Sequence, residues 1–217
     1  MGHDVEVVQT YEALLLSSEP PDFFLDVGAN YGTHSILFLS AGVPVIAFEP
    51  NPSCYSYFQA ACAINGFSGR WEQVAIGNGR GEIELIYPEK ETWLGSVSSD
   101  VTPGLKEWGD VTRLHVPVSN LDSYISEIPR GRLLIKIDVE GYEIEVLKGA
   151  ERMLRDYKPT VIFESNDAKL RDELFRLFEE SGYGIHSLPY KPSAPPGSPG
   201  PGRIPGLHGD QLHRGAP

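Results

Sequence analysis

The chain has 217 residues and a formal net charge of −12, with 41% hydrophobic and 22% charged residues. This is the composition of a globular protein, and the length suits one larger domain. The acidic excess argues against duplex nucleic acid as the main partner, because phosphate binding needs a dense positive face. We find neither a signal-peptide pattern nor a run approaching the ~20 apolar residues that span a bilayer. The sequence therefore predicts a cytoplasmic protein without a membrane span.

Short apolar runs alternate with helical patterns from residue 23 onward. Their β-branched and aromatic residues predict strands at 23–27, 45–49, 71–76, 82–87, 115–118, 133–137 and 160–164. Helical apolar repeats predict helices at 33–41, 53–65, 121–128, 142–156 and 167–181. A long loop is expected at 88–110. This alternation predicts an α/β fold with a Rossmann-like, doubly wound, mostly parallel sheet.

The loop after the first strand carries the first candidate site. It reads Asp26-Val27-Gly28-Ala29-Asn30-Tyr31-Gly32 and opens a helix, where ligands of open α/β sheets bind. Asn30 and Thr33 occupy two glycine positions of the dinucleotide fingerprint, which disfavours a nucleotide-dependent oxidoreductase. The remaining pattern is close to the S-adenosylmethionine (SAM) loop of Rossmann-like methyltransferases. The alternative is a tight turn without a ligand.

The ends of the second and third strands offer further cofactor contacts. Glu49 follows Gly28 by 21 residues, and an acid at about that distance binds ribose hydroxyls in nucleotide-binding α/β domains. Asn51 either assists Glu49 or caps the next helix. Ala75, within 74–76, is expected to lie along the adenine, although a plain strand is about equally favoured.

Two acids follow the fourth buried strand. Asp138 and Glu140 are two residues apart, so both can reach the same side of the strand tip. Carboxylates there would offset the positive charge of a sulfonium, and one could act as a general base for an alcohol acceptor. The alternative is that they are merely acids near the N-terminus of the next helix, where the helix dipole favours negative charge.

No metal site is predicted, because the six histidines show no metal-ligand spacing. A hard cation held by Asp138 and Glu164 is a less favoured alternative. His34 lies near the proposed site and is expected to be a packed or solvent-bonded histidine.

Four segments together resemble a known family: DVGANYG, AFEPNP, LLIKIDVEGYEIEVLKGAERML and PTVIFES. They resemble the successive motifs of the FkbM family of SAM-dependent methyltransferases over about residues 22–188. The resemblance implies a class I methyltransferase sheet, SAM as cofactor, and O-methylation of a hydroxyl on a sugar, glycan or natural product. By motif, Asp26 to Gly32 would hold the methionine part of SAM, Glu49 the ribose, and Asp138 and Glu140 the transfer site. The resemblance also places Gly95–Ser98 near the acceptor.

The C-terminal segment differs from the rest of the chain. Residues 189–217 include 8 Pro and 6 Gly, so we expect a domain at 1–188 and a disordered tail at 189–217. Methyltransferase sheets of this class usually end in a β-hairpin, and here no apolar run follows 184–188 to form its second strand. This leaves open an incomplete sheet, and with it a SAM-binding fold without turnover that serves as an interaction module. The sequence does not indicate an oligomeric state.

Overall fold

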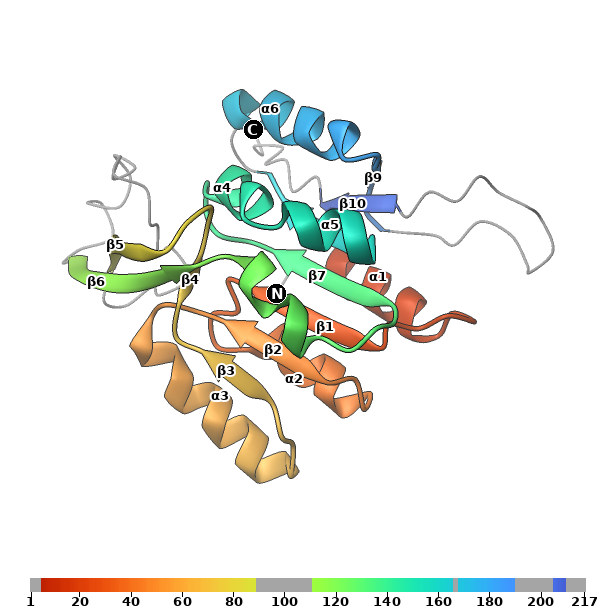
Figure 1. The fold of residues 1–217 in the computed structure, drawn as a ribbon. Helices are drawn as coiled ribbons and strands as arrows, with labels where there is room; N and C mark the ends of the chain where they lie inside the picture. The colour runs from red at the N-terminus through yellow and green to blue at the C-terminus, as the bar shows by residue number, and fades with distance from the viewer. Residues whose placement is uncertain (1–4, 89–110, 166–167, 190–204, 210–217) are drawn as a thin grey trace, which may run out of the picture.

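The computed structural model describes residues 5–88, 111–165, 168–189 and 205–209. Within these ranges seven strands form one sheet in the order β3-β2-β1-β7-β8-β10-β9, and every neighbouring pair is parallel. They are β1 (Phe23–Val27), β2 (Val45–Phe48), β3 (Arg70–Glu72), β7 (Leu133–Ile137), β8 (Thr160–Glu164), β9 (Gly184–Ser187) and β10 (Pro205–Gly209). The predicted α/β, Rossmann-like, doubly wound arrangement is confirmed (Figure 1).

Helices accompany these strands, mostly where the sequence predicts them. They are α1 (Val5–Leu15), α2 (Thr33–Ser40), α3 (Pro52–Asn65), the 3₁₀ helix η3 (Leu121–Glu127), α4 (Glu143–Lys148), α5 (Glu151–Tyr157) and α6 (Ala168–Glu180). Asn51 caps α3, and Gly66 ends it in the left-handed conformation that glycine favours. These local signals explain why the α3 boundaries are predicted within one residue.

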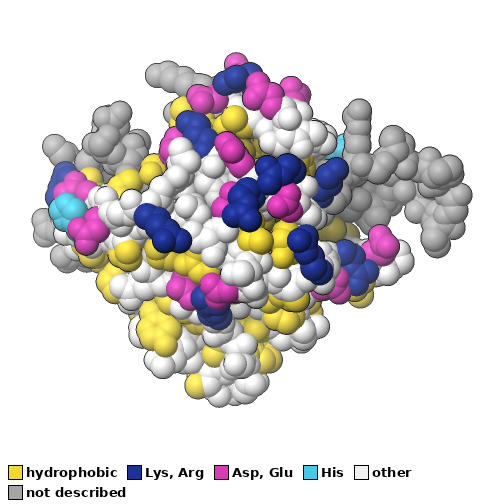
Figure 2. Space-filling view, in the orientation of Figure 1, with side chains coloured by type: hydrophobic (Ala, Val, Ile, Leu, Met, Phe, Trp, Pro, Cys, Tyr) yellow, Lys and Arg dark blue, Asp and Glu magenta, His cyan; other side chains and the backbone are white. Residues whose placement is uncertain are grey.

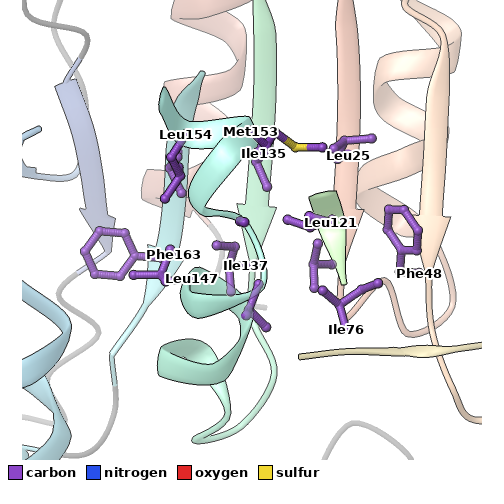
Figure 3. Packing of buried hydrophobic residues seen from close by; sticks show 14 of the residues in the cluster. Leu25, Phe48, Ile76, Leu121, Ile135, Ile137, Leu147, Met153, Leu154 and Phe163 are labelled. Carbon is purple, nitrogen blue, oxygen red and sulfur yellow. The ribbon is translucent and has the colours of Figure 1, made fainter. Parts of the chain in front are cut away.

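Two apolar layers enclose the main sheet. On one face, Tyr11 of α1 and Phe38 of α2 join the strand residues Phe24 and Leu134 in a buried cluster. The larger core lies on the other face, under η3, α4, α5 and α6. Figure 3 shows its members, which include Leu25, Phe48, Leu121, Ile135, Ile137, Leu147, Met153, Leu154 and Phe163. Successive strand residues alternate between the two layers, as the pleat of a strand requires.

Helix α1 has no counterpart in the sequence prediction. Tyr11 belongs to the buried cluster that also contains Phe38 of α2, and Val7, Leu14 and Leu15 pack against this cluster. Their spacing is that of an amphipathic helix, whereas the three valines of the segment favour helix only weakly. Tertiary packing therefore decides the conformation of this segment.

The single helix predicted at 142–156 is wrong, because the structure divides it into α4 and α5. The break lies at Gly149, where a Cβ would come within 2.0 Å of the carbonyl oxygen of Gly77. Asp122 then accepts a hydrogen bond from the backbone N–H of Met153 at 2.8 Å, near the start of α5. Close backbone approach and a distant capping side chain are not visible in a helical repeat.

The strand predicted at 71–76 is also divided. Arg70–Glu72 belongs to the main sheet, whereas β4 (Ala75–Ile76) joins β5 (Gly81–Pro88) and β6 (Val111–Ser119) in a second sheet of order β4-β6-β5. A tight turn, in which the Val74 N–H donates to the Glu72 carbonyl at 2.9 Å, ends the pairing with β2. In Figure 1 the second sheet lies on the side toward which the arrowheads of β2 and β7 point.

Strand β10 corrects the expectation of an incomplete sheet. It lies between β8 and β9, in the place of the missing hairpin strand, although it runs parallel to both neighbours. Parallel strands need a crossover of a dozen or more residues, and the chain from Ser187 to Pro205 is long enough for one. Residues 205–209 therefore belong to the sheet. The division at residue 188 otherwise stays a prediction, since 190–204 and 210–217 lie outside the described residues.

The described surface carries charges of both signs. On the face shown in Figure 2, Lys and Arg side chains are interspersed with Asp and Glu side chains. Among the residues that the structure describes, no helix is both long and apolar enough to cross a bilayer.

Candidate active site

The loop after β1 is fixed by the backbone of its neighbours. The N–H groups of Gly28 and Ala29 donate to the carbonyl oxygen of Phe48 at 3.0 and 3.1 Å. A Cβ on Gly28, whose φ is +76°, would lie 1.8 Å from the carbonyl oxygen of Asp138. The adjoining chain therefore requires glycine here, while the approach of a ligand to this residue stays a prediction.

The rest of the loop turns into α2 through two left-handed residues. Asn30 has φ +48° and Gly32 has φ +77°. Asparagine tolerates this conformation better than most residues, which explains its presence where a central glycine is common. A Cβ on Gly32 would lie 2.4 Å from a ring carbon of Phe58 in α3. The Gly32 N–H donates to the Ala29 carbonyl at 2.8 Å, so this donor is also used inside the protein.

Glu49 closes the loop from the end of β2. Its Oε2 accepts from the Asn30 N–H at 2.9 Å, and its Oε1 accepts from the Asn51 N–H at 2.8 Å. Burial raises the pKa of Glu49, while these two N–H donors act in the opposite direction. Each carboxylate oxygen can accept a second hydrogen bond, so Glu49 can hold the loop and still bind ribose hydroxyls.

Asn51 takes the capping role, and its assistance to Glu49 stays a prediction. Its Oδ1 accepts from the Ser53 N–H at 3.0 Å and caps α3. Its Nδ2 is buried and has no hydrogen-bond partner among the described residues. A buried donor without an acceptor is rare in native proteins, so Nδ2 marks a place where a ligand oxygen or nitrogen would fit beside Glu49.

Three carboxyl groups converge at the ends of β7 and β8. Asp138, Glu140 and Glu164 each offer an oxygen, and these atoms lie within 4.8 Å of one another. The side chains of Asp138 and Glu164 are hydrogen bonded. Such a bond needs a proton, because ionised carboxylates only accept. Sequence reasoning placed Asp138 and Glu140 at one strand tip, but it considered Glu164 only as a cation ligand.

The acids of this cluster have different proton affinities. Burial, together with the negative charges of Asp138 and Glu143, raises the pKa of Glu140 to about 7. Burial acts in the same direction on Asp138, but the Lys136 ammonium and the Glu164 hydrogen bond outweigh it and keep the pKa of Asp138 below its usual range. Carboxyl groups whose pKa values are pushed apart are typical of acid–base sites.

Glu140 is held in an unusual conformation. Its φ is +50°, which is uncommon for a residue other than glycine and is found preferentially at functional sites. Glu143 supports this turn, because its Oε1 accepts from the N–H groups of Gly141 at 3.2 Å and Val139 at 3.4 Å. The sequence analysis singled out only Asp138 and Glu140 in this segment, so the positioning role of Glu143 was missed.

Lys136 was also missed. It is the single charged residue of β7, whose five residues are all buried. Its Nζ donates to the Gly28 carbonyl at 2.8 Å and lies 3.5 Å from Asp26 Oδ1 and 3.3 Å from Asp138 Oδ2. Asp26 is itself fully buried and accepts from Ser35 Oγ at 2.7 Å. The sequence signal that could have identified Lys136 is a charged residue within the otherwise apolar run LLIKI.

His34 is held from α1. Its Nδ1 lies 3.1 Å from the Tyr11 hydroxyl, and Tyr11 is fully buried. The positive form of His34 also lowers the pKa of Asp138, which places the ring within electrostatic range of the acids. The expectation of a packed or solvent-bonded histidine stays a prediction.

Ala75, the residue expected along the adenine, lies away from these contacts. Ala75 is buried in the cluster of the second sheet, with Leu85, Tyr87 and Val116. Glu72, three residues earlier, accepts the Glu49 N–H with its carbonyl at 3.1 Å. The chain therefore contacts Glu49 shortly before it reaches Ala75. Gly95–Ser98 lies outside the described residues.

The three carboxylates also have the chemistry of a hard-cation site. The sequence raised this alternative for Asp138 and Glu164. However, the Lys136 ammonium already supplies a positive charge 3.3 Å from Asp138. A divalent cation bound there would be repelled by it.

The fold is that of the Rossmann-like methyltransferases, and residues 26–185 match the methyltransferase FkbM domain. This range begins at Asp26 and includes Glu49 and the three carboxyl groups. The chain belongs to the FkbM methyltransferase family.

Three relatives of this chain carry methyltransferase names. Methyltransferase sdnD of Sordaria araneosa is 30% identical over 210 residues, which cover 81% of this chain and 78% of that protein. Methyltransferase 1 of Beauveria bassiana is 28% identical, covering 68% and 66%. Hexuronic acid methyltransferase AglP of Haloferax volcanii is 28% identical, covering 69% and 58%. The chain thus spans less than the full length of each relative.

A solved structure shares the fold. The crystal structure of methyltransferase FkbM from Methylobacillus flagellatus has a TM-score of 0.52 to this chain at 18% identity. The likeness covers 76% of this chain and 39% of that one. The Rossmann-like arrangement is therefore shared despite low sequence identity.

Proposed function

We propose that this protein is a SAM-dependent O-methyltransferase that acts on a hydroxyl of a sugar, glycan or natural-product small molecule. The observation that carries the proposal is the position of the carboxyl cluster. Asp138 continues β7 directly beside Gly28, so the acids adjoin the loop that Glu49 closes. Family membership supports methyl transfer, and the geometry supports a cofactor-binding site next to a general base.

The residues present fit SAM. Glu49 has acceptor capacity for ribose hydroxyls, and the buried Nδ2 of Asn51 beside it lacks an acceptor among the described residues. The methionine end of the proposed SAM-binding site would be formed by Asp26, Gly28, Ala29, Asn30 and Gly32. Their own N–H groups at 28, 29, 30 and 32 have acceptors inside the protein, so contacts from this loop would use other atoms. Ala75 would border the adenine.

The carboxyl groups would act on the acceptor. When bound, SAM supplies an electrophilic methyl group on a positively charged sulfur. Glu140, with a pKa of about 7, is ionised in a large fraction near neutral pH and can take the proton of a hydroxyl. Asp138 stays ionised and offsets positive charge, while its hydrogen bond with Glu164 fixes its orientation.

The acceptor class is inferred from one relative and from the chemistry of the site. A hydroxyl needs a base, and the cluster offers one. Hexuronic acid methyltransferase AglP is a relative named for a sugar, which supports a sugar-type acceptor here.

A methyl-transfer assay tests the proposal. The protein would be incubated with methyl-labelled SAM and a panel of sugars, uronic acids, glycosides and polyketide alcohols. We expect label in at least one product, with release of S-adenosylhomocysteine (SAH), and loss of both in Glu140→Gln. Absence of SAM binding would contradict the proposal.

The non-catalytic alternative has lost one of its two motivations. It rested on an incomplete sheet and on the unusual C-terminal tail, and β10 occupies the sheet position in question. Binding of SAM without transfer across the whole panel would still favour it. The cytoplasmic location stays a prediction.

A further inference from the structure

Lys136 joins the two halves of the proposed site. Its ammonium contacts the Gly28 carbonyl in the cofactor loop, and it lies between Asp26 of β1 and Asp138 after β7. The register explains this, because Asp26 pairs with Lys136 across the two parallel strands and their side chains share a face. The Lys136 side chain is 8% exposed and that of Asp26 is fully buried.

A purely structural role explains this lysine poorly. Removing charges from water costs free energy, and well-packed apolar residues often stabilise a core as well as a buried ion pair. The other four residues of β7 are apolar, so an apolar residue would suit the strand. The 3.5 Å pair with Asp26 accounts for only part of the contacts of Lys136, because Nζ also reaches the Gly28 carbonyl and Asp138 Oδ2, which belong to the proposed site.

We propose that Lys136 is a positioning residue that sets the charge of the cofactor place and so limits its preference for a sulfonium over a neutral thioether. The inference rests on the proposed function, in which substrate and product differ by that one charge. Without a balancing cation, the acids would hold the sulfonium much more tightly than the thioether. With Lys136 present, the two forms bind more evenly, and the site can exchange SAH for SAM.

The reach of the ammonium supports this role. Lys136 helps to lower the pKa of Asp138 and opposes the rise that burial causes in the pKa of Glu49 and Glu140. The other charged groups that face this region are Asp26, Glu143, Glu164 and His34. Acids outnumber cations among them, so one ammonium changes the local balance strongly.

The test compares dissociation constants for SAM and SAH, measured by calorimetry, in the wild type and variants. Lys136→Met removes the charge at similar side-chain length. Lys148→Met is the matched control, because Lys148 forms a 2.8 Å pair with Glu145 on α4 and its side chain is 36% exposed. We expect the SAM-over-SAH preference to rise about tenfold in Lys136→Met and to stay unchanged in Lys148→Met. The double variant Lys136→Met/Asp138→Asn should return toward the wild-type ratio.

Each other outcome has a defined meaning. If Lys136→Met weakens both ligands equally, or changes neither, the proposal is wrong. If Lys136→Met does not fold, Lys136→Gln, which keeps a donor without the charge, must show the same rise in preference. Failure of both variants to fold would leave a structural role and overturn the proposal. A wild type that binds neither ligand would instead contradict the proposed function.

Discussion

The carbonyl oxygen of Asp138 fills the space that a side chain at Gly28 would need. The gap to an added Cβ is 1.8 Å, and the Asp138 N–H donates to the Val27 carbonyl at 3.1 Å. The first glycine of the loop and the first acid of the cluster are therefore one packing unit. A change at either residue should alter both the cofactor place and the base.

Gly28→Ala should destabilise the protein by about 3 kcal/mol, because the methyl group meets the backbone and φ is positive. Gly42→Ala is the matched control. Gly42 has φ +78°, but no atom lies within 4 Å of an added Cβ, so we expect a cost of only about 1 kcal/mol. Urea denaturation measures both. Equal costs would show that no clash occurs at Gly28.

Glu49→Gln should loosen the loop and weaken SAH binding. Both Glu49 oxygens accept backbone N–H groups, so the amide NH₂ of glutamine must face one of these donors. We expect a loss of about 1–3 kcal/mol in the free energy of unfolding. Glu84→Gln, at an exposed pair with Arg113, is the control and should change little. Unchanged stability and SAH affinity in Glu49→Gln would count against this role.

Glu140 should make stability depend on pH. Its pKa in the folded protein is about 7, above the ordinary 4.5, so the folded state binds the proton more tightly than the unfolded state. The contribution of Glu140 to stability is fully present below pH 4.5 and is lost as the pH rises through 7. Glu140→Gln should therefore stabilise the protein at pH 8 by up to about 3 kcal/mol relative to its effect at pH 4.5.

Denaturation curves at the two pH values measure this difference. Glu82→Gln, on an exposed part of β5, should show no comparable change between them. A variant effect at Glu140 that is the same at both pH values would show that its carboxyl group is not buried among negative charges.

The same group should shape the rate. If Glu140 is the general base, kcat rises with pH through about 7, as the carboxylate form accumulates. Glu140→Gln should lower kcat by roughly 10²–10⁴-fold and remove this rise. A variant that keeps the wild-type profile would assign the base elsewhere.

Chelation should leave activity unchanged. The Lys136 ammonium stands 3.3 Å from Asp138 and supplies the positive charge that a cation would bring. Transfer rates would be measured with EDTA and again after adding Mg²⁺. Loss with EDTA and recovery with Mg²⁺ would favour the cation alternative at Asp138 and Glu164.

Local signals predicted much of this molecule. Apolar runs identified the central strands, and Asn51 and Gly66 marked the ends of α3 because capping depends on neighbouring residues. The positions of Asp138 and Glu140 followed from the strand they end. Even the unusual Asn30 was recognised as part of the loop.

Contacts between distant segments could not be read in this way. Gly149 against Gly77 divides a helix, and Tyr11 packs under His34 from a helix with weak propensity. The pairing of Lys136 with Asp26 depends on strand register, which no local pattern contains. The same holds for β10, because its pairing with β8 and β9 joins segments that are far apart in the sequence.

Thermal unfolding with and without saturating SAH tests the central claim most directly. The account predicts stabilisation of about 2.7 kcal/mol at one hundred times the dissociation constant. The shift should persist in Gly42→Ala and be lost or much reduced in Glu49→Gln and Gly28→Ala. No shift of the wild type with either SAH or SAM would contradict the assignment of this site.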